Sequence, residues 1–167
     1  APVEIPAGTF RITAGFSVTQ RLVMRGQGKY LSWIKAVGMA SDTSMFAMTG
    51  TELVPINGWE VSGINFSSNN AGSGTGPRAW TMTWCINGIM TDCYFYEVAR
   101  GWVGNHSFLN NFRSVAIYGV YRESWLLEAE CNNNTWQSCG VRSISAHGMD
   151  VVGNVANITL IGCNVEG

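Results

Sequence analysis

Two carboxylates, Glu128 and Asp150, are the residues of this sequence best suited to act as an acid and base pair. If the chain coils with a repeat of about 23 residues, they lie on one face of a parallel sheet, diagonally across neighbouring strands, about 8 Å apart. Inverting glycoside hydrolysis uses two carboxyl groups about 6.5–9.5 Å apart. Glu130, two residues from Glu128, extends the acidic patch as a candidate substrate contact. An ordinary solvated polar face remains the alternative for all three residues.

A second group of polar residues recurs with nearly the same spacing. Arg100, Ser124 and His147 are separated by 24 and 23 residues, so we expect them to stack at one corner of the coil. Three further candidates lie beside that corner. Arg122 and Glu123 immediately precede Ser124, and Glu97 is expected one coil before Tyr121. Arginines can bind an acidic sugar, while a carboxylate and a histidine transfer protons near neutral pH.

This corner leaves three interpretations open. Glu123 and His147 could act as catalytic groups, with Arg100, Arg122 and Glu97 binding the substrate. A polysaccharide lyase would instead need a base such as His147 or Tyr121 near an arginine that neutralises a uronate carboxylate. The third interpretation has no function: the residues would form an ordinary ladder of surface salt bridges, which would contribute little to stability.

Aromatic residues offer a surface on which a sugar ring can stack. With Cys85 taken as inward, strand alternation places Trp80 and Trp84 on the outward face, where they serve either as glycan contacts or as a subunit interface. Trp102 and Trp125 are expected in the core or at a subunit contact. The same alternation predicts an exposed apolar row, which would indicate a partner surface: Trp80, Val103 and Leu126. It also predicts that His106 points inward and is buried.

The elements that must position these side chains are indicated by a repeat. Asn87, Asn111, Asn134 and Asn157 recur at intervals of 24, 23 and 23 residues, and a second column follows them: Cys93, Ile117, Cys139 and Cys163. A fixed period in this range is typical of stacked supersecondary units. Short runs of Val, Ile, Thr and aromatic residues between Gly, Asn and Ser breaks predict an all-β chain. Because the side-chain order returns in one direction, we predict a right-handed parallel β-helix.

The organisation along the chain is expected to be one β-helix domain over residues 1–167, with irregular first coils at 1–60 and regular coils at 79–167. Longer excursions are expected at Lys29–Thr51 and Ser67–Arg78. Since the sequence stops within another repeat, we expect it to be a fragment of a longer chain, truncated at its C-terminus.

Composition limits the classes of partner. A net charge of −1 gives no electrostatic case for nucleic acid or an acidic membrane. No apolar run approaches the roughly 20 residues of a membrane helix, so no membrane insertion is expected. The five Cys follow the repeat and lack the short spacings of a zinc site, which predicts buried free thiols, no metal and no cofactor.

One set of motifs resembles a known group. An Ile-Pro-Ala-Gly-Thr-Phe opening at Ile5–Phe10, a turn with Gly26 and Gly28, and the Asn and Cys coils resemble the pectin-lyase-like β-helix superfamily. Within it, the chain is most similar to the β-helical bodies of bacteriophage tailspikes and tail fibres. The resemblance implies an extracellular or virion homotrimer that binds a bacterial surface polysaccharide, from capsule or lipopolysaccharide, and often cleaves it. A non-catalytic adhesin or fibre module is the alternative of a different class.

Overall fold

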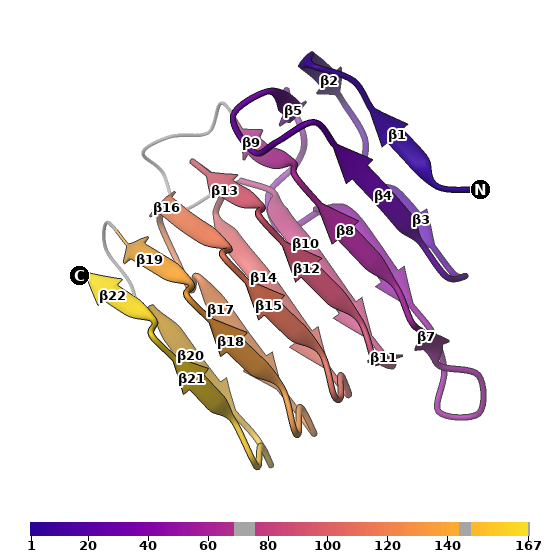
Figure 1. Cartoon of the computed structure of the whole chain (residues 1–167), viewed down its shortest axis with the longest axis vertical. Helices are drawn as coiled ribbons and strands as arrows, with labels where there is room; N and C mark the ends of the chain where they lie inside the picture. The colour runs from indigo at the N-terminus through magenta and orange to yellow at the C-terminus, as the bar shows by residue number, and fades with distance from the viewer. Residues whose placement is uncertain (69–75, 144–147, 167) are drawn as a thin grey trace.

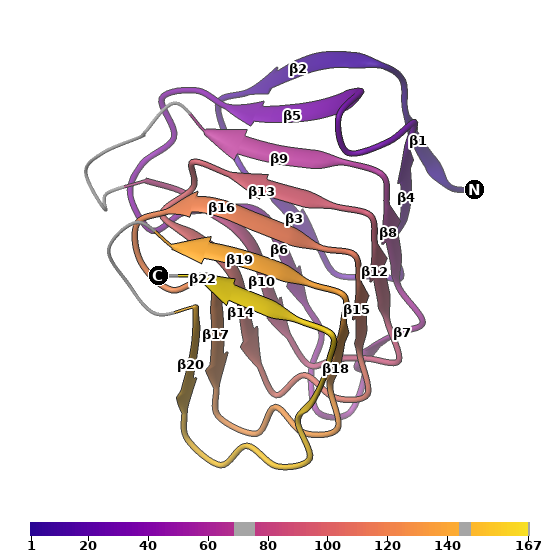
Figure 2. The same cartoon turned by 60° about the vertical axis from the view of Figure 1, so that its left-hand side comes forward.

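The computed structural model describes residues 1–68, 76–143 and 148–166. Within these ranges the chain has no helix, and it winds into a right-handed parallel β-helix with three long faces (Figures 1 and 2). Each coil contributes one strand to each face in turn, and equivalent strands of successive coils pair in parallel. The predicted fold class is therefore confirmed.

Three sheets and one short pair hold the described strands. Sheet A contains β1 (Val3–Ile5), β4 (Val23–Gly26), β8 (Glu60–Ser62), β12 (Ile89–Thr91), β15 (Asn111–Arg113), β18 (Thr135–Gln137) and β21 (Thr159–Ile161). Sheet B contains β2 (Gly8–Ile12), β5 (Ser32–Ala36), β9 (Asn65–Ser68), β13 (Tyr94–Tyr96), β16 (Ala116–Val120), β19 (Gly140–Ser143) and β22 (Asn164–Glu166). Sheet C contains β3 (Phe16–Val18), β6 (Ser44–Thr49), β10 (Arg78–Thr83), β14 (Arg100–Asn105), β17 (Trp125–Glu128) and β20 (Met149–Val152). The short pair is β7 (Ile56–Asn57) with β11 (Cys85–Ile86).

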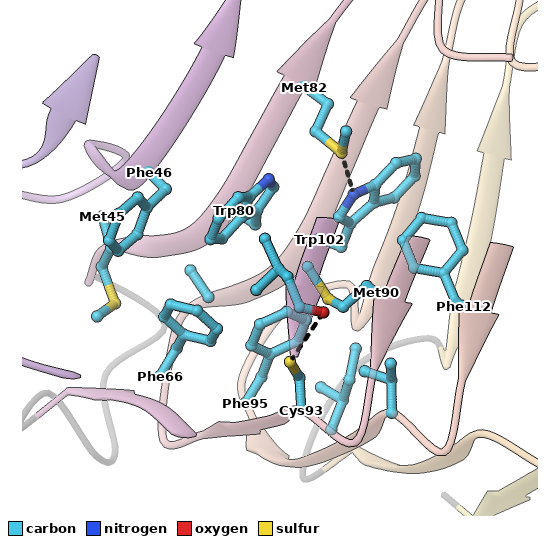
Figure 3. Close-up of a cluster of buried hydrophobic side chains, with 14 of the residues drawn as sticks. Met45, Phe46, Phe66, Trp80, Met82, Met90, Cys93, Phe95, Trp102 and Phe112 are labelled. Carbon is cyan, nitrogen blue, oxygen red and sulfur yellow. Dashed lines mark hydrogen bonds between the residues drawn. The ribbon is translucent and has the colours of Figure 1, made fainter. Parts of the chain in front are cut away.

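The interior is a column of large apolar side chains (Figure 3). Alternation along sheet C turns Phe46, Trp80, Trp102 and Trp125 inward in register. Phe46 and Trp80 stack with ring centroids 4.8 Å apart, whereas Trp102 and Trp125 are tilted at 5.9 Å. Gly104 lies beside this column, and a Cβ there would come within 2.0 Å of the Trp102 ring. Burying several aromatics, each worth about 1.5–3 kcal/mol, is the main stabilising term.

Cysteine thiols line the inside of the corners, as the sequence predicted for the group. The five Cys are free, and four of them are buried. Cys93 Sγ donates to the Thr91 carbonyl of its own coil and, at 3.9 Å, to Val61 of the coil before it. Burial raises the pKa of Cys85 and of Cys93 to about 12, so the thiols remain protonated small apolar fillers. The sequence placed Ile117 between Cys93 and Cys139 in the column of inward side chains. The structure has Val115 at that position, and Ile117 pairs with Phe95 instead.

The asparagines form two adjacent columns rather than the one expected. Asn110 and Asn134 are fully buried, and Asn134 Oδ1 accepts from the Asn110 amide N at 2.9 Å and from its Nδ2 at 3.1 Å. Asn87 and Asn157 instead take the left-handed conformation in the next column, with φ of 52° and 55°. Asn111 lies in β15, paired with Ile89. The carboxamides of Asn87, Asn111, Asn134 and Asn157 therefore do not stack in one row, although the coil period they indicated is real.

Other register details also differ from expectation. Trp80 pairs with Trp102 rather than Val103, which turns Trp80 inward, where it is fully buried. Val103 and Leu126 are outward but only 1% and 5% exposed, so the expected exposed apolar row does not exist. The segment Lys29–Thr51, expected as an excursion, contains β5 and β6.

More than half of the exposed large apolar side chains lie instead at the two ends of the solenoid, although the two most exposed, Leu53 and Val54, lie between β6 and β7. Phe10 and Phe16 are 41% and 49% exposed at one end, and Leu160 and Val165 are 53% and 58% exposed at the other. The described part of the chain contains no helix long and apolar enough to cross a membrane.

Candidate functional site

The outer face of sheet B carries a cluster of tyrosines. In β13, alternation turns Phe95 into the core and leaves Tyr94 and Tyr96 outward and half-buried. Tyr118 of β16 is the direct neighbour of Tyr96 one coil on. The Tyr94 ring lies 5.7 Å from Tyr96 and 5.6 Å from Tyr118, and it meets Tyr30 edge-on at 6.1 Å. The four rings form one aromatic surface.

A groove of about 460 Å³ runs along this surface, and we call it the tyrosine groove. Its depth comes from small residues, because Ala116 and Gly140 follow Tyr94 in the same outward column. A Cβ at Gly140 would lie 3.4 Å from the Tyr118 hydroxyl, so Tyr118 leans over the glycine. The groove is lined by Lys29, Tyr30, Tyr94, Ser114, Val115, Ala116, Tyr118, Ser138 and Gly140.

The polar groups of the groove are neutral donors together with one ion pair. Burial, assisted by the neighbouring tyrosines, raises the pKa of Tyr94 to about 12, so its hydroxyl keeps its proton. A hydrogen bond to Glu97 raises the pKa of Tyr96. Lys29 Nζ lies 3.0 Å from Asp92 Oδ1 and 3.5 Å from the Ser114 carbonyl at the rim. Flat rings with hydroxyl and ammonium donors around them suit a polyhydroxylated ligand.

A second cluster, the arginine corner, lies where sheet B turns into sheet C. It consists of Asp42, Arg78, Arg100, Arg122 and Glu123. Asp42 Oδ1 accepts from Arg100 Nη1 at 2.9 Å, from Arg122 Nη1 at 3.3 Å and from Arg78 Nη2 at 3.4 Å. Arg100 Nε also donates to Glu123 Oε2 at 2.5 Å. The structure thus brings together Arg100, Arg122 and Glu123 as expected, and adds Asp42 and Arg78, which the sequence did not reveal.

The ionisation of Glu123 follows from these contacts. Burial acts to raise its pKa, but the Arg100 hydrogen bond and the charges of Arg100 and Arg122 outweigh it and lower the pKa. A general acid needs a raised pKa near the working pH. Glu123 therefore suits ion pairing with arginine better than proton donation.

The carboxylate pair has the expected register. Leu126 pairs with Asp150 and Glu128 with Val152, so Glu128 and Asp150 are diagonal neighbours on the outer face of sheet C. Both are half-buried. Strand geometry gives about 8 Å between them. No role in catalysis follows from the register alone.

The remaining expected site residues are dispersed. Trp80 is in the core and cannot contact a substrate, because its register is one residue from that expected. Trp84 is half-exposed and stacks on His106 at 4.4 Å, which corrects the inward burial expected for His106. Glu130 is exposed beside a small hollow formed with Asn132 and Asn154. His147 lies outside the described residues.

Two alignments at the corner also need correction. Glu97, whose φ is 54°, lies one coil before Gly119, rather than Tyr121. Arg100 is the equivalent of Glu123, one residue from the expected Ser124. Within the described residues no group of three or more His, Cys, Asp or Glu is placed to hold a metal ion.

Comparison with known proteins finds likeness in structure but not in sequence. No family model matches the chain, and no curated protein matches it. The catalytic domain of a GH87 α-1,3-glucanase, solved with nigerose, superposes with a TM-score of 0.75 at 14% identity, covering 92% of this chain and 27% of that one. The gp42 tailspike of Acinetobacter phage vb_AbaP_AS12 gives 0.71 at 10% identity, covering 98% and 36%. Pre-mature bacteriophage phi29 gene product 12 gives 0.62 at 14%, covering 98% and 29%.

These identities establish the fold alone. The chain spans roughly a third or less of each of these three structures. The chain has a right-handed parallel β-helix fold, and the fold is similar to that of the gp42 tailspike and of the GH87 glucanase catalytic domain.

Proposed function

We propose that this β-helix binds a bacterial surface polysaccharide, from capsule or lipopolysaccharide, as part of a tailspike-like protein. The tyrosine groove carries the proposal, because half-exposed aromatic rings around a floor of small residues fit the faces of sugar rings. Structural neighbours that include a tailspike and a glucanase solved with nigerose support the same ligand class.

Replacing one groove tyrosine tests this proposal. Tyr118→Ala should weaken binding to a recognised polysaccharide about tenfold, since it removes one stacking wall. Titration calorimetry against purified capsular and lipopolysaccharide glycans gives the affinity. Trp84→Ala is the matched control, because Trp84 is another half-exposed aromatic on a different corner. If Trp84→Ala lost affinity for the polysaccharide and Tyr118→Ala kept it, the tyrosine groove would be rejected as the binding site.

Cleavage by carboxylates is a second candidate function, favoured by the register of Glu128 and Asp150. We propose that they act as an inverting acid and base pair. Release of reducing ends from the bound glycan measures hydrolysis, and ultraviolet-absorbing unsaturated products would indicate a lyase instead. Glu128→Gln and Asp150→Asn should each lower hydrolysis at least a hundredfold without changing affinity. Full activity in both variants would exclude this pair, and absence of any product would leave a binding module.

The assembly and location are further parts of this proposal. We propose a homotrimer at the tail of a virion or otherwise outside the cell, supported by the tailspike and phage neighbours. Sedimentation equilibrium of the protein tests the trimer, and a monomer at micromolar concentration would argue against it.

A further inference from the structure

We propose that the arginine corner binds an acidic group of the polysaccharide, a carboxylate such as that of a uronic acid. This inference rests on the proposed function, because it names the chemical class of the same ligand. Arginine guanidinium groups suit a carboxylate because their planar donors match its two oxygens.

The first support is an imbalance of charge. Arg78 and Arg100 are direct neighbours on β10 and β14, and Arg122 adds a third guanidinium from the next coil. Within residues 1–68, 76–143 and 148–166, the carboxylates that face them are Asp42 and Glu123. Three positive charges against two negative charges leave the corner with an excess of one positive charge, which favours an additional anion.

The second support is access. The side chains of Arg78 and Arg122 are 27% and 39% exposed, whereas that of Arg100 is 11% exposed and anchors the cluster through Glu123. Arg78 Nε has no hydrogen-bond partner among the described residues. A buried donor without an acceptor costs free energy, and a small shift of the side chain toward an incoming carboxylate would relieve it.

The third support is distance from the tyrosine groove. Tyr118 lies in β16, and Arg122 follows two residues after that strand ends at Val120. Four residues span at most about 14 Å, so a short oligosaccharide stacked on Tyr118 can reach the guanidinium of Arg122. Figure 2 shows the strands of sheet B running toward this corner.

Asp42 gives the inference its sharpest consequence. Its one oxygen Oδ1 contacts all three arginines and is therefore in competition with the carboxylate of a ligand. Removing the charge of Asp42 should strengthen the binding of an acidic glycan, while removing the charge of Arg122 should weaken it. If the cluster only stabilised the fold, neither variant would change the affinity for an acidic glycan, and the two variants would not shift that affinity in opposite directions.

The test uses pairs of probes. Acidic capsular polysaccharides and their carboxyl-reduced counterparts are titrated into the wild type and into Arg122→Gln, Asp42→Asn and Tyr118→Ala. Arg113→Gln is the matched control, since Arg113 is an exposed arginine on sheet A. We expect Arg122→Gln to weaken binding of the acidic form about five- to tenfold and to leave the reduced form unchanged. Asp42→Asn should strengthen binding of the acidic form about threefold, and both effects should shrink in high salt.

The outcomes separate the two proposals. Tyr118→Ala should weaken binding of both the acidic and the carboxyl-reduced polysaccharide. If it does so while Arg122→Gln and Asp42→Asn leave the affinity unchanged, the inference is overturned and the proposed function stands. Equal effects of Arg122→Gln and Arg113→Gln would overturn it as well, since they would show only a general charge effect. A wild type that binds neither form would reject both proposals. Thermal unfolding of each variant is measured in parallel. The inference also fails if Arg122→Gln loses affinity only at temperatures at which that variant is unfolded.

Discussion

The outer faces of sheets B and C stand on the same interior but differ in what they present. On sheet B the outward positions carry Tyr94, Tyr96 and Tyr118, and the first and last of these line a groove with a floor of small residues. On sheet C they carry Thr81, Val103 and Leu126, of which the last two are almost fully buried. The interior columns are large and apolar behind both faces. The identity of the outward residue therefore decides whether a face becomes a groove, while the shared interior supplies most of the stability.

The largest expected effect tests this division of roles. Trp102→Ala should lower the free energy of unfolding by about 3–5 kcal/mol, because it leaves a cavity among buried aromatics. Tyr118→Ala, on the outer face, should cost less than about 1 kcal/mol. Denaturant unfolding of both variants measures the difference, and equal losses would contradict it.

An intermediate effect concerns the thiols of the shared interior. The pKa of Cys93 rises from 9.0 to about 12 on folding, so between these values the folded state holds a proton that the unfolded state has lost. Stability from this group is therefore full below pH 9 and falls by about 1.4 kcal/mol per pH unit above it. Unfolding at pH 8 to 10.5 should show a slope for the wild type that is smaller in Cys93→Ala. An identical slope in the two proteins would mean that this thiol ionises freely.

The smallest expected effect compares the two outer faces directly. Gly140→Leu should fill the floor of the tyrosine groove and weaken polysaccharide binding about tenfold, or about 1.4 kcal/mol. Thr81→Leu adds similar bulk to the outer face of sheet C and should leave binding unchanged. Calorimetric titration of both variants checks this. A loss confined to Thr81→Leu would move the binding surface to sheet C.

The fold could be predicted because its period is carried by many side chains. Val103 pairs with Leu126, and Leu126 pairs with Asp150, as the sequence-based register predicted. The same register placed Glu128 diagonal to Asp150. The register failed at Trp80, because the step from Trp80 to its true neighbour Trp102 is shorter than the steps that follow. A difference of one residue reverses the face of every side chain on a strand.

The asparagines misled for a related reason. Left-handed and buried positions lie next to each other at this corner, and asparagine suits both, as Asn133 and Asn134 show. Periodicity alone does not distinguish the two columns. Burial and the hydrogen bonds between Asn110 and Asn134 identify the structural ladder, whereas positive φ identifies the turn positions.

The tyrosine groove was missed, although one signal was present. The sequence Tyr94-Phe95-Tyr96 alternates a phenol with a purely apolar ring, as expected for a strand with one solvated face. The contribution of Lys29 and Tyr30 could not be seen, because they come from a coil far away in the sequence. The arginine corner was found in part, and Asp42 was hidden for the same reason.

The tilted arrangement of Trp102, Trp125 and Trp136 has an optical consequence. Their ring centroids lie between 5.6 and 6.3 Å apart and their planes are inclined at 53° to 81°. Indoles that are so close and so inclined couple their electronic transitions and give a strong circular dichroism couplet in the ultraviolet. Trp102 lies one coil before Trp125 and Trp136, so its share of the couplet depends on neighbouring coils staying in contact. Spectroscopy can therefore follow the separation of these coils without an added label.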